Sequence, residues 1–73
     1  MNKLFVYEVN GETVEDTEAF GQGWKKAKEI ATREHTYITR QVIKGNDIRN
    51  EFYSKGGCFL PEKFFEKDKV MIF

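Results

Sequence analysis

The sequence predicts a small α+β domain of two layers, in which one main helix packs on a mostly antiparallel sheet of about three or four strands. Apolar, aromatic and β-branched residues run from Leu4 to Val9, as is typical of a strand. Apolar residues recur at helical spacing between Phe20 and Ala31. Gly45-Asn46, between two further apolar segments, is a favoured hairpin loop. We therefore expect strand, helix, strand, strand, short helix and strand in a single domain spanning residues 1–73.

The first predicted strand, Leu4–Val9, is apolar on both of its faces, and an interior position in the sheet would explain this pattern. Asn10-Gly11 is typical of a turn. The residues after it, Glu12–Val14, are expected to form a short return strand.

The main helix is expected to have Asp16 or Thr17 as its N-cap and to run to about Glu34. Gly21 and Gly23 should each weaken its first turn by roughly 1 kcal/mol relative to Ala. Their presence indicates either close packing of the helix on the sheet or a helix that begins nearer Gly23. One stripe of apolar side chains is expected to face the sheet: Phe20, Trp24, Ala27 and Ala31.

The loop Gly45-Asn46 sets the pairing of the two hairpin strands. Gly takes the positive φ of the first loop position at no steric cost. Opposite-charge and aliphatic pairs across the strands support the resulting register, at roughly 0.2–1 kcal/mol each. Counting outward from the loop gives these pairs: Lys44 with Asp47, Ile43 with Ile48, Arg40 with Glu51, Thr39 with Phe52, and Ile38 with Tyr53.

Alternation divides the hairpin side chains between the two faces of the sheet. One face is expected to lie in the core: Tyr37, Ile43, Ile48 and Phe52. The other face is mixed and is expected to be solvated: Ile38, Arg40, Val42, Arg49, Glu51 and Tyr53.

The C-terminal part is expected to add a short helix and a last strand. Gly56-Gly57 interrupts the hairpin strand, and the apolar run Cys58–Leu60 precedes Pro61. Pro61 suits the first turn of a short helix that ends near Phe65. Val70–Phe73 is expected to be a strand, and it must pair within the domain or with another copy, because an unpaired apolar edge promotes aggregation.

Composition indicates a globular protein. Twelve Lys and Arg balance twelve Asp and Glu, yet residues 25–55 carry eight bases against four acids. No apolar segment approaches the ~20 residues that span a bilayer, and Glu8 interrupts the first apolar run, which is untypical of a signal peptide. The one cysteine fits a reducing cytosol. We therefore expect a cytoplasmic protein without a membrane partner.

No set of residues is typical of an active site. His35 is the one histidine, and neither it nor Cys58 has partners at a recognisable spacing. Gly56-Gly57 lacks the remaining residues of a phosphate-binding loop. An acidic cluster is attributed to helix capping and solubility, and the alternative is a patch that mimics nucleic acid or binds a basic partner: Glu12, Glu15, Asp16 and Glu18. We expect no enzyme activity, catalytic residue, metal, cofactor or small-molecule ligand.

Two binding functions remain. The first is binding to a protein partner or to a second copy, which the apolar C-terminus favours. The alternative is nucleic-acid binding through the hairpin of residues 36–54, because surfaces that bind single strands combine bases with stacking aromatic rings. The expected binding residues are Arg40, Lys44, Arg49 and Tyr53.

The segments Gly23–Ala31 (GWKKAKEIA) and Glu51–Phe59 (EFYSKGGCF) are similar in style to small proteins encoded by phages and prophages of Gram-positive bacteria. Some such proteins bind and inhibit host proteins. The resemblance implies an accessory protein that acts in the cytoplasm of a bacterial host through a protein partner. It assigns no function to individual residues.

Overall fold

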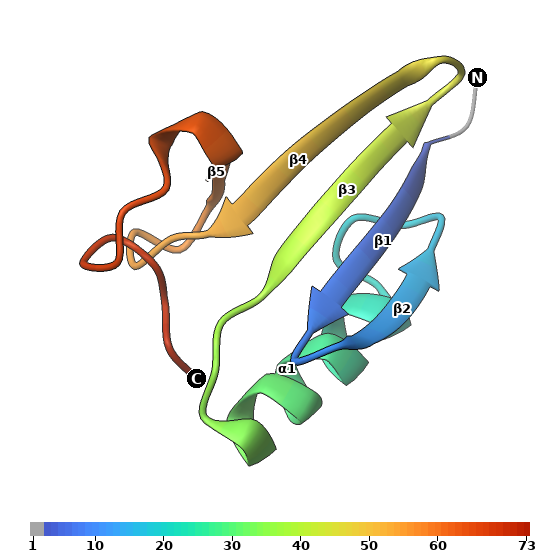
Figure 1. The fold of residues 1–73 in the computed structure, drawn as a ribbon. Coiled ribbons are helices and arrows are strands. Elements are labelled where there is room, and N and C mark those ends of the chain that lie inside the picture. The colour runs from blue at the N-terminus through green and yellow to red at the C-terminus, as the bar shows by residue number, and fades with distance from the viewer. Residues whose placement is uncertain (1–2) are drawn as a thin grey trace.

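A five-stranded antiparallel sheet with the order β2-β1-β3-β4-β5 forms the centre of the fold in a computed structural model (Figure 1). The structure describes residues 3–73, so Met1 and Asn2 of the predicted domain lie outside the described residues. The elements are β1 (Leu4–Val9), β2 (Glu12–Asp16), α1 (Gln22–Glu34), β3 (Thr39–Lys44), β4 (Asp47–Tyr53), β5 (Phe59–Pro61) and the 3-10 helix η1 (Glu62–Phe64).

The predicted α+β class is confirmed, but the sheet has five strands instead of three or four. The run before Pro61 forms strand β5, in which Phe59 pairs with Tyr53. The expected last strand, Val70–Phe73, is not a regular strand. Val70 instead forms an isolated bridge with Ser54, and this segment pairs within the chain.

The predicted hairpin register is confirmed. Lys44 pairs with Asp47 and Arg40 pairs with Glu51. Gly45 has a φ of 60°, the left-handed value that glycine adopts without strain. The first strand occupies the predicted residues and lies between β2 and β3, which explains why it is apolar on both faces.

The helix begins later than the N-cap prediction of Asp16 or Thr17, because Asp16 ends strand β2 and α1 starts at Gln22. Asp16 nevertheless stabilises the first turn of α1, although it lies outside the helix at the end of β2. Its carboxylate accepts hydrogen bonds from the backbone N–H of Gly23 at 2.7 Å and of Glu18 at 3.1 Å. These bonds, that from Gly23 foremost, lower the pKa of Asp16.

Position 23 is a glycine because the Asp16 side chain packs closely against its backbone. A Cβ at position 23 would lie 2.7 Å from the Cβ of Asp16. Gly23→Ala is therefore expected to displace Asp16 and to lower the free energy of unfolding by about 1–3 kcal/mol, although Ala is the better helix former. Urea denaturation measures the loss. The matched control is the exposed neighbouring change Gln22→Ala, and a Gly23→Ala variant at least as stable as wild type would contradict this packing.

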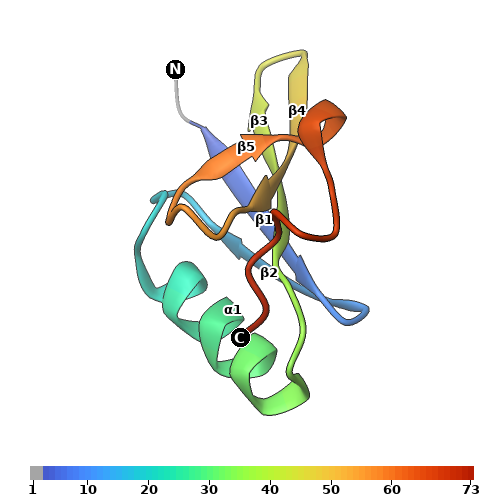
Figure 2. The same cartoon turned by 90° about the vertical axis from the view of Figure 1, so that its left-hand side faces the viewer.

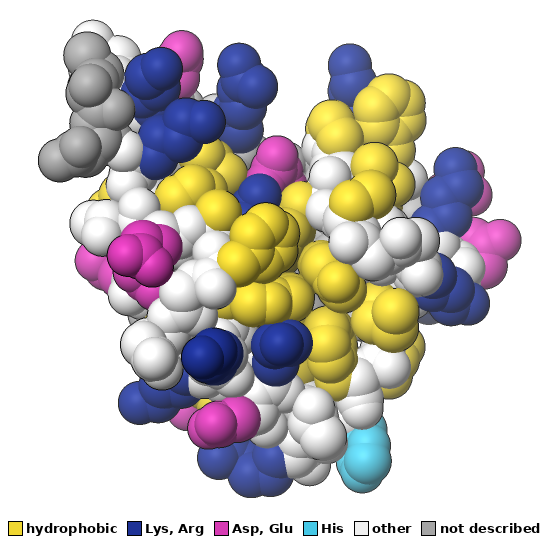
Figure 3. All heavy atoms as spheres, turned by 180° about the vertical axis from the view of Figure 1, so that it is seen from behind, with side chains coloured by type: hydrophobic (Ala, Val, Ile, Leu, Met, Phe, Trp, Pro, Cys, Tyr) yellow, Lys and Arg dark blue, Asp and Glu magenta, His cyan; other side chains and the backbone are white. Residues whose placement is uncertain are grey.

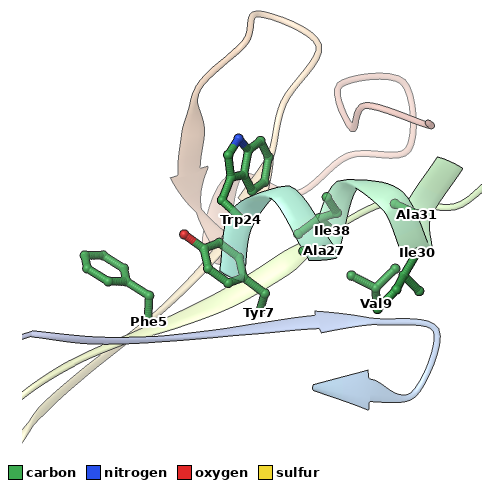
Figure 4. Packing of buried hydrophobic residues seen from close by; sticks show 8 residues of the cluster. All are labelled: Phe5, Tyr7, Val9, Trp24, Ala27, Ile30, Ala31 and Ile38. Carbon is green, nitrogen blue, oxygen red and sulfur yellow. The ribbon is translucent and has the colours of Figure 1, made fainter. Parts of the chain in front are cut away.

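The core lies between α1 and the face of the sheet that the helix covers (Figure 4). Trp24, Ala27 and Ala31 are buried there, as predicted from the helical stripe. The fourth stripe residue, Phe20, was predicted wrongly: it precedes the helix and is 59% exposed. The buried cluster comprises Phe5, Tyr7, Val9, Trp24, Ala27, Ile30, Ala31 and Ile38.

The face assignment of the hairpin is wrong. Ile38 is fully buried beneath the helix, and Val42 and Tyr53 pack against the same core. Ile43 and Ile48 lie on the opposite face, which the helix does not cover. Ile48 is 58% exposed, and Tyr37 is exposed as well.

Phe52, also assigned to the core, is buried, but on the helix-free side. Phe65, which follows η1, packs edge-on against it with ring centroids 5.2 Å apart, and also contacts Tyr37 at 5.8 Å. Figure 2 shows α1 and η1 on opposite sides of the sheet. The short C-terminal helix lies within the predicted stretch, but it is a 3-10 helix that begins at Glu62, because Pro61 ends strand β5. It covers part of the second sheet face.

Candidate binding surfaces

The first candidate surface is a hollow on the helix side of the sheet, at the hairpin end that α1 leaves uncovered. Its volume is about 520 Å³. Its charged lining residues are Lys3, Arg40, Lys44, Asp47, Arg49 and Glu51. Because four bases face two acids, we name it the basic hollow. Figure 3 shows Lys and Arg side chains gathered at this end, next to hydrophobic side chains in the middle of the same side.

Strand alternation and register bring the bases of the hollow together. Val42 pairs with Arg49 across β3 and β4, and the next helix-side position on β3 is Lys44. Lys3 precedes β1 and lines the same hollow. Lys3, Lys44 and Arg49 are all exposed. These three side chains are therefore free to meet a ligand.

Arg40 forms the inner wall of the hollow and is already engaged. Its Nε donates to Glu51 Oε1 at 2.7 Å, and its side chain is only 11% exposed. The guanidinium lies 3.7 Å from the ring centroid of Phe59 and 5.1 Å from that of Phe5. Its Nη1 is buried, and no described atom accepts a hydrogen bond from it. Arg40 thus contributes more to packing than to the free charge of the hollow.

Tyr7 and Phe20 join the hollow to the loop before α1. The Tyr7 hydroxyl donates a hydrogen bond to the carbonyl of Ala19. Burial raises the pKa of Tyr7, and nearby Arg40 opposes this effect. The adjacent Phe20 ring packs edge-on against Trp24, with centroids 5.7 Å apart, and lies 5.8 Å from the Arg40 guanidinium. The exposed ring of Phe20 is therefore held next to the wall of the hollow.

The predicted binding residues divide between two environments. Lys44 and Arg49 are exposed in the basic hollow. Tyr53 is half-buried against the core, where its ring lies 4.8 Å from that of Trp24 and 5.0 Å from that of Phe59. Sequence reasoning missed Lys3 and Phe20. Alternation from Phe5 could have placed Lys3 on the helix side, whereas the helical pattern pointed Phe20 inward.

The second candidate surface is the side of the sheet without the helix, which we name the open face. Its strands present these exposed or half-buried apolar side chains: Leu4, Val6, Ile43, Ile48 and Leu60. Phe64 and Phe65 are also exposed, beside this face. Glu8 and Glu15 are exposed on it, whereas its described strand positions carry no Lys or Arg. The open face thus has an aliphatic row, exposed polar Gln41 and Asn50 beside it, and an acidic margin.

The remaining polar residues singled out in the sequence are His35, Cys58 and the acidic cluster. His35 ends α1 in the left-handed conformation, with φ 51° and ψ 53°. Cys58 is exposed, and its carbonyl accepts a hydrogen bond from Ser54 Oγ at 2.7 Å. In the predicted acidic cluster, Glu12 pairs with Arg33 at 3.1 Å.

Within residues 3–73, no three His, Cys, Asp or Glu side chains gather in a way that could hold a metal ion. No helix in the same range combines the length and the apolar character needed to cross a bilayer. Comparison with known proteins finds no family model, no curated protein and no solved structure that matches the chain.

Proposed function

We propose that the protein is a non-enzymatic binding protein and that a different protein docks on its open face. The observation that carries this proposal is Ile48, which is 58% exposed at one end of an aliphatic row, next to the hairpin loop. Its partner across the strands is Ile43, which in turn pairs with Leu4. An antiparallel sheet that faces water normally alternates to polar residues on its wet side. A contiguous apolar patch on such a face is typical of an interaction site.

Charge indicates the chemistry of the partner. The charged strand residues of the open face are Glu8 and Glu15, and no base accompanies them among its described strand positions. A partner with an apolar centre and Lys or Arg at its margin would complement both features. A second copy meeting this face with its own open face would bring only further acids from its described strand positions. The charges therefore favour a different protein.

Two sequence features bear on the cell and the compartment in which the protein would act. The resemblance to phage and prophage proteins suggests a bacterial host protein as the partner, by analogy alone. The one cysteine is compatible with the reducing cytoplasm of such a host. We propose that the protein acts in that compartment.

Site-specific photo-crosslinking in the native cell tests the proposal. A benzophenone amino acid at position 48 samples the open face, and one at Lys26, exposed on α1, is the matched control. We expect a heterologous adduct from position 48 alone, with the crosslinked peptide rich in apolar residues flanked by Lys or Arg. Ile48→Asp should weaken the purified complex by roughly tenfold or more, because the change would bury a charge in an apolar contact.

Three results would overturn the proposal. An adduct of twice the chain mass would show that the open face binds a second copy. Equal adducts from positions 48 and 26 would indicate contact without a specific surface. The absence of any protein adduct at position 48 would leave the open face without a protein partner.

A further inference from the structure

We propose that the basic hollow and the ring of Phe20 form a binding site for single-stranded nucleic acid, on the side of the sheet opposite to the open face. This site goes beyond the proposed protein docking, because it uses other residues and another ligand class. It also differs from the expected hairpin surface, in which Tyr53 was the stacking residue. Three features support this assignment: the exposed bases, the exposed ring of Phe20, and Arg40, which lines the hollow next to that ring.

The phosphate-binding part consists of Lys3, Lys44 and Arg49. All three are exposed, and they surround one hollow of about 520 Å³. Arg40 is compensated by Glu51 at 2.7 Å. Asp47 is the remaining acid of the lining, so the exposed bases leave an excess of positive charge. Such a concentration of bases attracts a phosphodiester backbone, which releases counterions when it binds.

The stacking part is Phe20, which is 59% exposed. Its ring is supported by Trp24 at 5.7 Å and by Phe59 at 6.4 Å, so it is held in place while much of its surface faces solvent. A supported, exposed aromatic ring is what an unpaired base stacks on. The Arg40 guanidinium, which lines the hollow, lies 5.8 Å from the ring centroid and joins the two parts.

The combination favours a nucleic acid over an acidic peptide. Carboxylates would satisfy the bases of the hollow but would make no use of the ring of Phe20. A single strand is favoured over a duplex, because bases within a duplex are already stacked on one another and do not reach the ring. The open face is excluded as the site, since Glu8 and Glu15 would repel phosphates there.

Fluorescence anisotropy with short labelled oligothymidylate and oligouridylate, at low salt, tests the site with the full chain. We expect binding by wild type that weakens as salt is raised. Phe20→Ala should weaken binding by roughly five- to a hundredfold, the range that loss of one base–aromatic stack covers. Arg49→Ala should weaken it and reduce the salt slope by about 0.7, the value for one phosphate contact on a single strand.

The control for charge is Lys26→Ala, which removes an exposed base from α1 instead of from the hollow. It should bind as wild type does, and circular dichroism melting curves show that each variant is folded. The two oligonucleotides distinguish a DNA ligand from an RNA ligand. Binding in both arms, or in one, supports the site.

Each contrary outcome overturns the assignment. No anisotropy change at low salt would remove nucleic acid as a ligand. Equal losses from Lys26→Ala and Arg49→Ala would show diffuse attraction without a site. Retention of full affinity by Phe20→Ala would show that no base stacks on this ring and would overturn the proposed site. Displacement by polyglutamate as effective as by unlabelled oligonucleotide would identify the hollow as a site for acidic protein segments.

Discussion

Trp24→Ala is expected to lower the free energy of unfolding by about 3–5 kcal/mol, as large-to-small changes of buried aromatic residues do. Trp24 is only 7% exposed, and its ring lies within 6 Å of those of Tyr7, Tyr53 and Phe59. For a chain of 73 residues, a total stability of roughly 4–11 kcal/mol is expected. The variant should therefore be close to unfolding in water. Urea denaturation followed by circular dichroism measures the loss.

The exposed neighbour Phe20 provides the control, because Phe20→Ala changes a similar ring on the solvent side of Trp24 and should cost less than about 1 kcal/mol. Trp24 is the one tryptophan of the chain, so native fluorescence reports on it alone. We expect iodide to quench this fluorescence weakly. A Trp24→Ala loss below about 1 kcal/mol together with strong quenching would show that the indole is not part of the core.

The fold could be predicted from the sequence wherever local rules decide the outcome. Strand β1 and the hairpin register followed from residue type, alternation and the Gly45-Asn46 loop, all of which act over a few residues. The helix start could not be assigned to one residue. Asp16 has the side chain of an N-cap, yet it caps the helix from strand β2, through a tertiary contact with Gly23. Asp16 lies too far before the helix in the sequence for a local rule to predict that contact.

The two faces of the hairpin were exchanged because charge was equated with exposure. Arg40 and Glu51 were correctly paired, but a cross-strand pair that neutralises itself, and whose guanidinium stacks on Phe59, is accommodated beside the core. Ile43 and Ile48 looked like core residues by composition. They lie instead on the face that α1 does not cover, so only the arrangement of the layers reveals their exposure.

The binding surfaces were predictable only in part for the same reason. Strand alternation correctly placed Lys44 and Arg49 on one side of the hairpin, and their role in binding stays a prediction. Phe20 was misplaced by extending the helical period into the loop before Gln22. The concavity that joins these residues depends on how far α1 extends over the sheet, and no local pattern contains that information.

Glu51→Gln is expected to lower the free energy of unfolding by about 3 kcal/mol, the lower end of the range for breaking a buried ion pair, since both partners keep some exposure. The change preserves size but leaves the Arg40 charge without its carboxylate. The Arg40 side chain is 11% exposed, and its Nη1 already lacks a described acceptor, so water can replace Glu51 only poorly. Urea denaturation at neutral pH measures the loss.

The matched control is Glu12→Gln, which breaks the Arg33–Glu12 pair of 3.1 Å on the exposed surface. Such surface pairs contribute about 0–1 kcal/mol. Equal losses in the two Glu→Gln variants would mean that Arg40 is well solvated. The double variant Arg40→Met with Glu51→Gln should recover much of the loss, because no charge then remains buried. That recovery would assign Arg40 to the packing of the fold and leave Lys3, Lys44 and Arg49 as the exposed bases of the hollow.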